Sequence, residues 1–190
     1  MAPSAQIFVS HSKKDPNLPF FCEAFNGSPL KPVLMEFGNV DLPWWKPIKE
    51  QVAASVATFV LLSKPLEERK YTQNWIDFEV GLSCAQNKQV WVFEPQNQEV
   101  EFNVPYCTYY CIYNPEEPSE VKRVKWYNDM YSGLGAATGL YRAPLATCPK
   151  ESCRLQFHMM MMGDAESFRC PSCRTRFRWD RLTQKVEPQE

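Results

Sequence analysis

The chain has 190 residues, of which 44% are hydrophobic and 14% aromatic, and its formal net charge at pH 7 is −1. This composition excludes a disordered protein, and the near-neutral charge creates no overall field that would favour nucleic acid or a membrane surface. No apolar run approaches the roughly 20 residues of a membrane span, and the N-terminus lacks the basic and then apolar order of a secretory signal. We therefore expect a cytoplasmic protein with one main core and a small additional unit.

Short apolar runs predict strands at residues 6–10, 32–37, 58–63, 89–93 and 106–113. Helical spacing and helix-start residues predict helices near 20–25, after Pro43, over 75–86 with Asn74 as N-cap, and from about 119 with Ser119 as N-cap. Strands that alternate with helices, with continuously apolar central strands, indicate an α/β fold whose five-stranded parallel sheet has helices on both faces. Ligands of such sheets bind beyond the carboxyl ends of the strands, where we place the loops at 10–16, 37–44 and 63–74.

Charge and cysteine spacing both change near residue 148. Residues 1–147 contain 13 basic and 16 acidic side chains, net −3, whereas residues 148–186 contain 8 and 4, net +4. Two close cysteine pairs fall in the second part, and in a cytosolic chain such pairs indicate metal binding. The other four cysteines are scattered among apolar residues, which favours buried small hydrophobes: Cys22, Cys84, Cys107 and Cys111. We predict a first domain over 1–136, a linker over 137–147 and a metal-binding unit over 148–186.

Trp75 and Glu79 lie four residues apart in the predicted helix over 75–86, and side chains at this spacing share one helix face. The helix follows the apolar run at 58–63. A carboxylate near the carboxyl end of a strand, beside an aromatic surface, can bind a sugar and stabilise a developing positive charge. A solvated helix glutamate is the plainer alternative.

Four segments in order resemble one family. Residues 7–15 (IFVSHSKKD) are similar to the opening strand and loop of a Toll/interleukin-1 receptor (TIR) domain, and residues 59–63 (FVLLS) to its third strand. Trp75 to Glu79 matches the W-x-x-x-E motif of TIR domains that cleave NAD, and Val90 to Phe93 matches the next strand. The resemblance covers roughly residues 5–135. It implies a flavodoxin-like sheet of about five parallel strands.

The resemblance also implies an activity, cleavage of the nicotinamide–ribose bond of NAD, with Glu79 as the catalytic residue. Its carboxylate would hydrogen-bond the ribose hydroxyls and stabilise an oxocarbenium-like transition state. Lys13 or Lys14 would meet the pyrophosphate as a point charge, although a solvated loop explains both lysines as well. The substrate-binding residues implied by the resemblance are His11, Ser12, Lys13, Glu36, Trp44 and Trp75.

Three functions follow from these features. The first is an NAD glycohydrolase or ADP-ribosyl cyclase that serves defence or cell-death signalling and self-associates through its TIR domain. The second is a non-catalytic TIR interaction module, which a buried, ion-paired Glu79 facing no cavity would favour. The third is a nucleoside-processing relative that uses a carboxylate against an anomeric carbon. The loop Phe37 to Pro43 is compact compared with the family, which leaves the assembly geometry open.

The two cysteine pairs, with sixteen residues between them, resemble a zinc ribbon. Zn²⁺ prefers four thiolates in a closed tetrahedron, so we predict a structural zinc on Cys148, Cys153, Cys170 and Cys173. Residues 155–158 and 167–169 would pair as strands between the knuckles, and Phe177 and Trp179 would cover a hydrophobic side. Disulfides are the alternative that a cytosolic location disfavours.

The predicted ribbon carries a basic face. Its arginines are Arg169, Arg174, Arg176, Arg178 and Arg181. Such a face can contact nucleic acid, an acidic protein partner, or the acidic first domain of the same chain. Met159 to Met162 would lie at the hairpin tip or pack against the first domain.

Overall fold

The computed structural model describes residues 5–35, 45–96, 98–131, 143–160, 167–180, 182–183 and 185–189, with side chains of the helix ending at 131 described up to residue 125. Among these residues, seven strands form a central sheet in the order β2-β1-β3-β4-β5-β7-β6. The strands are β1 Gln6–Ser10, β2 Lys31–Leu34, β3 Ala57–Leu61, β4 Gln89–Pro95, β5 Tyr109–Tyr113, β6 Leu145–Thr147 and β7 Gln156–Met160. Neighbouring strands are parallel except β6 and β7, which are antiparallel.

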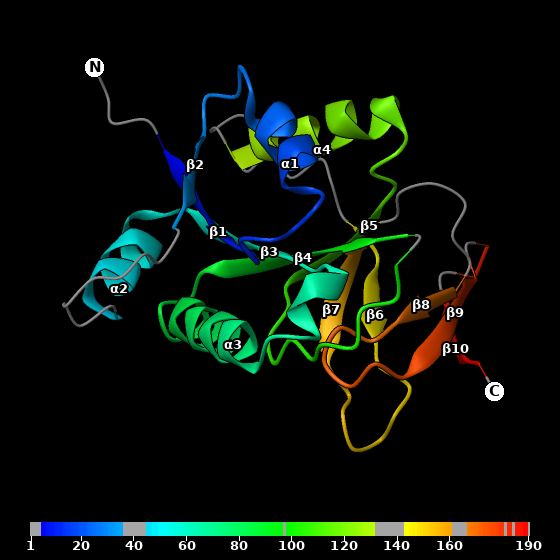
Figure 1. The fold of residues 1–190 in the computed structure, drawn as a ribbon. Helices are drawn as coiled ribbons and strands as arrows, with labels where there is room; N and C mark the ends of the chain where they lie inside the picture. Colours follow the sequence, from blue (N-terminus) through cyan, green and yellow to red (C-terminus); the bar gives the residue numbers. More distant parts are fainter. Residues whose placement is uncertain are drawn as a thin grey trace.

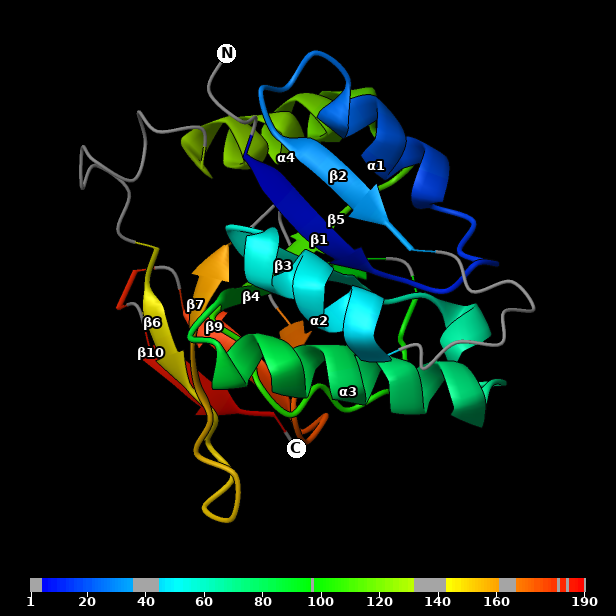
Figure 2. The ribbon, with the colours of Figure 1, turned by 90° about the vertical axis from the view of Figure 1, so that its left-hand side faces the viewer.

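Helices cover both faces of this sheet (Figure 1). They are α1 Leu18–Phe25, α2 Trp45–Ala54, α3 Lys70–Ala85 and α4 Pro118–Tyr131, with a short 3-10 helix η1 at Lys64–Leu66. Figure 2 shows α1 and α4 on one face and α2 and α3 on the other. On the first face Phe21 of α1 and Val124 of α4 join Phe93 in one core, and on the second Ile76 of α3 packs with Val92. None of the described helices is both long and apolar enough to cross a membrane.

The strand order indicates at which edge of the main sheet a ligand-binding site is expected. All five residues of β3 are buried, as a parallel strand covered on both faces requires. The first five strands follow the order 2-1-3-4-5, which is the doubly wound order of flavodoxin-like sheets. The chain leaves β1 toward β2 and then crosses back to β3, so β1 and β3 flank the topological switch point. Their carboxyl ends therefore border the crevice in which such folds bind ligands.

The α/β prediction with a largely parallel sheet is confirmed, but the five-strand count is wrong because β7 and β6 extend the sheet beyond β5. β6 has only three residues, two of them exposed, so no periodic pattern marks it. The predicted N-caps are also wrong. Asn74 and Ser119 both lie inside helices, because α3 begins at Lys70 and α4 begins at Pro118.

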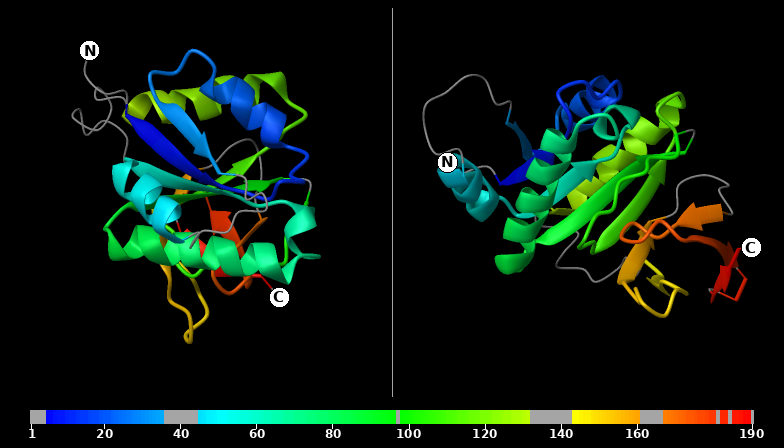
Figure 3. Two further views of the ribbon diagram at one scale, coloured as in Figure 1. Left: turned by 60° about the vertical axis from the view of Figure 1, so that its left-hand side comes forward. Right: turned by 60° about the horizontal axis from the view of Figure 1, so that its bottom comes forward.

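A second, three-stranded sheet lies beyond the carboxyl ends of β4 and β5 (Figure 3). It is antiparallel in the order β10-β9-β8, with β8 Ser167–Arg169, β9 Arg176–Asp180 and β10 Lys185–Pro188. The predicted pairing of 155–158 with 167–169 is wrong, since β7 pairs with β6 and β5 whereas β8 pairs with β9. Each cysteine pair instead has a hairpin of its own.

The two sheets share one core. Phe177 and Trp179 of β9 are buried, as predicted, and they belong to the same cluster as Val92 of β4 and Tyr110 of β5. The predicted linker contains β6, and the predicted ribbon contributes β7 to the main sheet. Met159 and Met160 are buried in β7, so packing against the main sheet, and not a hairpin tip, describes these two methionines.

Candidate functional site

Glu79 and Ser10 meet at the switch point of the main sheet. Ser10 is the last residue of β1, and Glu79 lies in α3, on the helix turn that covers this end of the strand. Ser10 Oγ donates a hydrogen bond to Glu79 Oε2 at 2.5 Å, and only 5% of Glu79 is exposed. The structure therefore places a nearly dry carboxyl group beside the carboxyl end of β1.

The environment of Glu79 changes its protonation. Burial raises the pKa of its carboxyl to about 7, and the hydrogen bond from Ser10 opposes only part of that rise. Near neutral pH the group is therefore divided between its acid and its carboxylate forms. A group poised in this way can exchange a proton, or can present a negative charge in a low-dielectric setting.

Trp75 lies one turn before Glu79 in α3 and is half-buried. It packs beside Phe8 and Val52 in the core under α2. The rings of Tyr71 and Phe78 meet it edge-on, with centroids 6.0 Å and 5.7 Å away. The indole is therefore held in place by its neighbours.

The other predicted pocket residues fall into two groups. His11 is half-buried with Nδ1 3.1 Å from Val9 O, Ser12 is buried, and Lys13 is exposed. Glu36 and Trp44, together with the loop between them, lie outside the described residues.

A second set of buried polar groups follows β1, β3 and β5 at the same edge of the sheet. Burial raises the pKa of Asp15 to about 6, although a hydrogen bond of 2.9 Å from the Asn17 backbone N–H opposes the rise. Tyr113 joins them, because burial and then the charge of Asp15 raise the pKa of its phenol. Four buried polar atoms in this part of the described chain have no hydrogen-bond partner: Asp15 Oδ2, Asn17 Nδ2, Ser63 Oγ and Tyr113 Oη. A water or a ligand hydroxyl would satisfy them.

Two cavities in the described part of the chain lie away from Glu79. One of about 90 Å³ lies between the carboxyl ends of β4 and β5 and the small sheet, and its lining includes Tyr110 and Arg169. The other, of about 390 Å³, lies between the starts of α1 and α4 and is lined by Asn17 and Phe20 among others. Neither is lined by Glu79.

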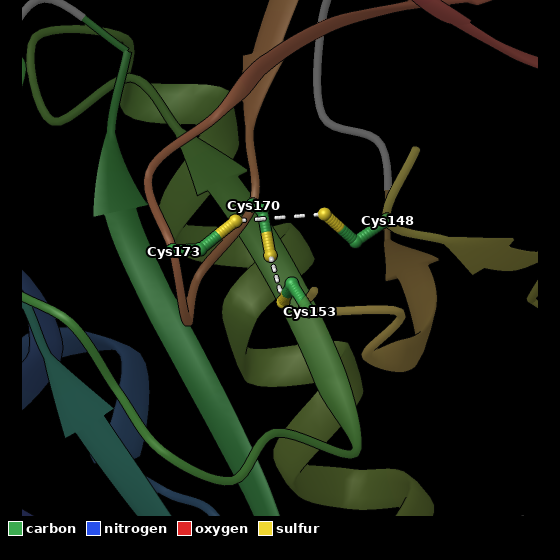
Figure 4. Close-up of side chains that lie close together, drawn as sticks. All are labelled: Cys148, Cys153, Cys170 and Cys173. Atoms are coloured by element: carbon green, nitrogen blue, oxygen red, sulfur yellow. Dashed lines mark hydrogen bonds between the residues drawn. The ribbon is translucent and has the colours of Figure 1, made fainter. Parts of the chain in front are cut away.

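The four paired cysteines converge (Figure 4). Cys148 Sγ lies 3.5 Å from Cys173 Sγ, Cys153 Sγ lies 3.8 Å from Cys170 Sγ, and all four sulfurs lie within 4.8 Å of one another. A tetrahedral Zn²⁺ with Zn–S bonds of about 2.3 Å has S···S edges of about 3.8 Å, whereas a disulfide requires about 2.05 Å. The four thiols are free, so the predicted grouping is confirmed and its spacing fits a metal ion such as zinc.

Electrostatics at this centre also favour a cation. Burial raises the pKa of the Cys148 thiol to about 11 and raises that of Cys170 further, against hydrogen bonds from backbone N–H groups. At Cys173 burial again raises the pKa, but hydrogen bonds with Thr175 and with the Cys148 and Cys153 side chains together lower it to about 7. Two of the four cysteines are buried and two are half-buried. Deprotonating all four thiols in this setting requires a positive charge at their centre, which a divalent ion supplies.

Three of the five ribbon arginines contact the acidic segment that ends β4 and follows it. Arg174 pairs with Glu94, Arg176 pairs with Glu99, and Arg169 pairs with Glu99 at 2.5 Å and with Glu101. Contact with the acidic first part of the same chain, one of the three contacts considered for the basic face, is therefore present for these three arginines. Arg178 is exposed, and Arg181 lies outside the described residues.

The four cysteines outside the two pairs differ in exposure. Cys107 and Cys111 are buried as predicted, but Cys22 and Cys84 are exposed because they lie on the outer faces of α1 and α3. Sequence reasoning missed Ser10 as the partner of Glu79 and Glu94 as the partner of Arg174. The only available signal for either was its position at the carboxyl end of a predicted strand.

Comparison with protein-family models gives no match for this chain, and comparison with curated proteins gives none either.

Proposed function

We propose that the chain is an NAD-cleaving enzyme of the TIR type, with Glu79 as its essential residue. The single observation that carries this proposal is the buried carboxyl of Glu79, held by Ser10 at the carboxyl end of β1. Sheets of this topology bind ligands beside that switch point. The W-x-x-x-E spacing brings Trp75 to the same helix one turn away.

Cleavage of the nicotinamide–ribose bond needs mainly a negative charge held close to the ribose. Nicotinamide in NAD is already a cationic leaving group, so breaking its bond to ribose leaves positive charge on the sugar. The Glu79 carboxylate would stabilise that charge strongly, because few waters surround it to screen the interaction. Attack by water gives ADP-ribose, and attack by an adenine nitrogen gives a cyclic isomer. By analogy with the family, either product would serve defence signalling.

The test is chromatography of NAD after incubation with the purified chain, beside parallel incubations with deoxynucleosides. Release of nicotinamide supports the proposal, whereas release of a free base from deoxynucleosides alone assigns the site to nucleoside processing. The assay runs from nanomolar to micromolar protein, because activity that rises with concentration indicates a site completed by a second copy.

A non-catalytic interaction module is the second candidate. The observation that favours it is that Glu79 is almost fully buried, accepts a hydrogen bond from Ser10, and does not line either of the cavities described above among the described residues. A chain that releases neither nicotinamide from NAD nor a free base from deoxynucleosides at any concentration would favour this candidate.

For the cysteine centre we propose a structural zinc. Four thiolates leave no open position for substrate, which excludes the usual form of a catalytic site. We expect one zinc per chain by metal analysis of protein purified without chelator. A metal content near zero, or a different metal in stoichiometric amount, contradicts the assignment.

Acid–base behaviour gives a further prediction. If the carboxylate of Glu79 is the active form, turnover rises with pH through a midpoint near 7, where the group loses its proton. Removing the Ser10 hydroxyl removes a bond that lowers this pKa, so Ser10→Ala should move the midpoint to higher pH.

The matched control for that experiment is Ser83→Ala. Ser83 is a buried serine one turn along α3, and its Oγ donates to the Glu79 backbone carbonyl at 2.8 Å. Its removal leaves the carboxylate untouched, so the midpoint should stay in place. Equal midpoints in both variants would show that Glu79 does not control the profile.

A further inference from the structure

The second cysteine pair is attached to the segment that follows β4. Pro171 lies between Cys170 and Cys173, and its carbonyl accepts a hydrogen bond of 2.8 Å from the Val104 backbone N–H. Val104 belongs to residues 98–106, a segment without regular structure that we call the edge loop. The turn that carries two metal ligands therefore also holds this loop.

Arg174 makes a second, deeper connection. It follows Cys173 directly, has a φ of 57°, and brings its guanidinium against Glu94 at the end of β4. The side chains of both partners are 6% exposed. Tyr110 Oη donates to the other oxygen of Glu94 at 2.5 Å, so the carboxylate joins the cysteine turn to β5 as well.

The edge loop also contributes to this connection. The Val100 N–H donates to Glu94 Oε1 at 3.4 Å, and Glu99 and Glu101 of the loop pair with arginines of β8 and β9. The cavity of about 90 Å³ lies within this seam. Buried polar pairs stabilise this seam only while both partners stay in place, because a buried charge left without its partner is costly.

We propose that the four-cysteine centre acts as a clamp, whose metal occupancy keeps the edge loop and the end of β4 in place. The metal fixes the turn at 170–173, the turn positions the Pro171 carbonyl and the Arg174 guanidinium, and these two groups hold the edge loop and Glu94. Loss of the metal frees the turn, and Glu94 is then left buried without its counter-charge. The clamp rests on the metal site alone and is independent of the chemistry proposed for Glu79.

The first cysteine pair supplies a natural contrast. Arg154 follows Cys153 as Arg174 follows Cys173, and it has a similar φ of 45°. Its side chain is 71% exposed and lies 3.9 Å from Glu151, whose side chain is 92% exposed. The residue after the second cysteine of each pair is therefore an exposed arginine in the first pair and a buried, ion-paired arginine in the second.

Hydrogen exchange on the full-length, zinc-loaded chain tests the proposal. After removal of the zinc by a chelator, we expect exchange in the edge loop, and at the Val104 amide above all, to accelerate about tenfold or more. At short labelling times β1, which exchanges only when the whole chain unfolds, should stay protected even though the metal-free chain is less stable. An edge loop that stays as protected at short labelling times as it is in the zinc-loaded chain would overturn the clamp.

Substitutions test the role of Arg174 with the metal in place. Arg174→Met should accelerate exchange in the edge loop by about tenfold while zinc remains at one per chain, and Arg154→Met should leave it unchanged. The double variant Arg174→Met with Glu94→Gln should recover part of the protection, because no unpaired charge remains buried. Identical behaviour of the two arginine variants would contradict a role for Arg174. If Arg174→Met does not fold, the chelator experiment on the unmodified chain decides.

Discussion

Glu79→Gln should reduce nicotinamide release by about 100-fold or more, by analogy with the loss of other groups that stabilise transition-state charge. Glutamine keeps the size of the side chain and an oxygen that can accept the hydrogen bond from Ser10. It removes the negative charge that the reaction needs. Chromatography of NAD incubated with each protein measures the loss, and unchanged turnover would move the chemistry to another residue.

Stability provides the control for this substitution. Below pH 4.5 Glu79 is protonated in both the folded and the unfolded chain, but between pH 4.5 and about 7 only the unfolded chain loses the proton. The free energy of unfolding of the wild type therefore falls as pH rises through this window, by about 3 kcal/mol at most. The glutamine variant lacks this penalty, so at pH 8 it should be at least as stable as the wild type. A variant that is inactive because it is unfolded would show the opposite result.

Some features of the fold follow directly from sequence pattern. The apolar runs at 6–10, 58–63 and 89–93 correspond to β1, β3 and β4, because strands buried on both faces need continuous apolar residues. The cysteine centre followed from spacing, since two short pairs can bring four thiolates to one ion. In both cases the physical requirement lies within a few neighbouring residues, and the sequence displays it.

Other features depend on tertiary contacts. β6 has three residues, and only its pairing with β7 gives it a partner. Arg174 resembles Arg154 in sequence and in backbone angle, yet one is buried and the other exposed because only Arg174 faces an acidic strand end. The Ser10–Glu79 bond joins residues 69 positions apart, and no local pattern reports such a contact.

The most consequential tertiary feature is the junction between the cysteine unit and the main sheet. Sequence composition and cysteine spacing suggested a small metal-binding ribbon appended to a larger domain. In the structure β7 pairs with β5, and Phe157 and Trp179 lie in one cluster with Val92. Residues that share a core and a sheet unfold together. The metal should therefore stabilise the whole chain.

The substitution Cys148→Ser tests whether the metal stabilises the whole chain. Loss of one of four ligands weakens the metal site, and loss of a structural metal belongs to the few changes that cost about 4 kcal/mol or more. For a chain of this length we expect the thermal midpoint to fall by about 10 °C or more. We expect a single transition by both far-UV circular dichroism and tryptophan fluorescence, because Trp91 in β4 and Trp179 in β9 report on the two sheets. Cys84→Ser is the matched control, since Cys84 is exposed on α3 and should shift the midpoint little. Two separate transitions, with the main one unmoved, would instead mean that the cysteine unit folds on its own and that the shared core couples the two parts only weakly.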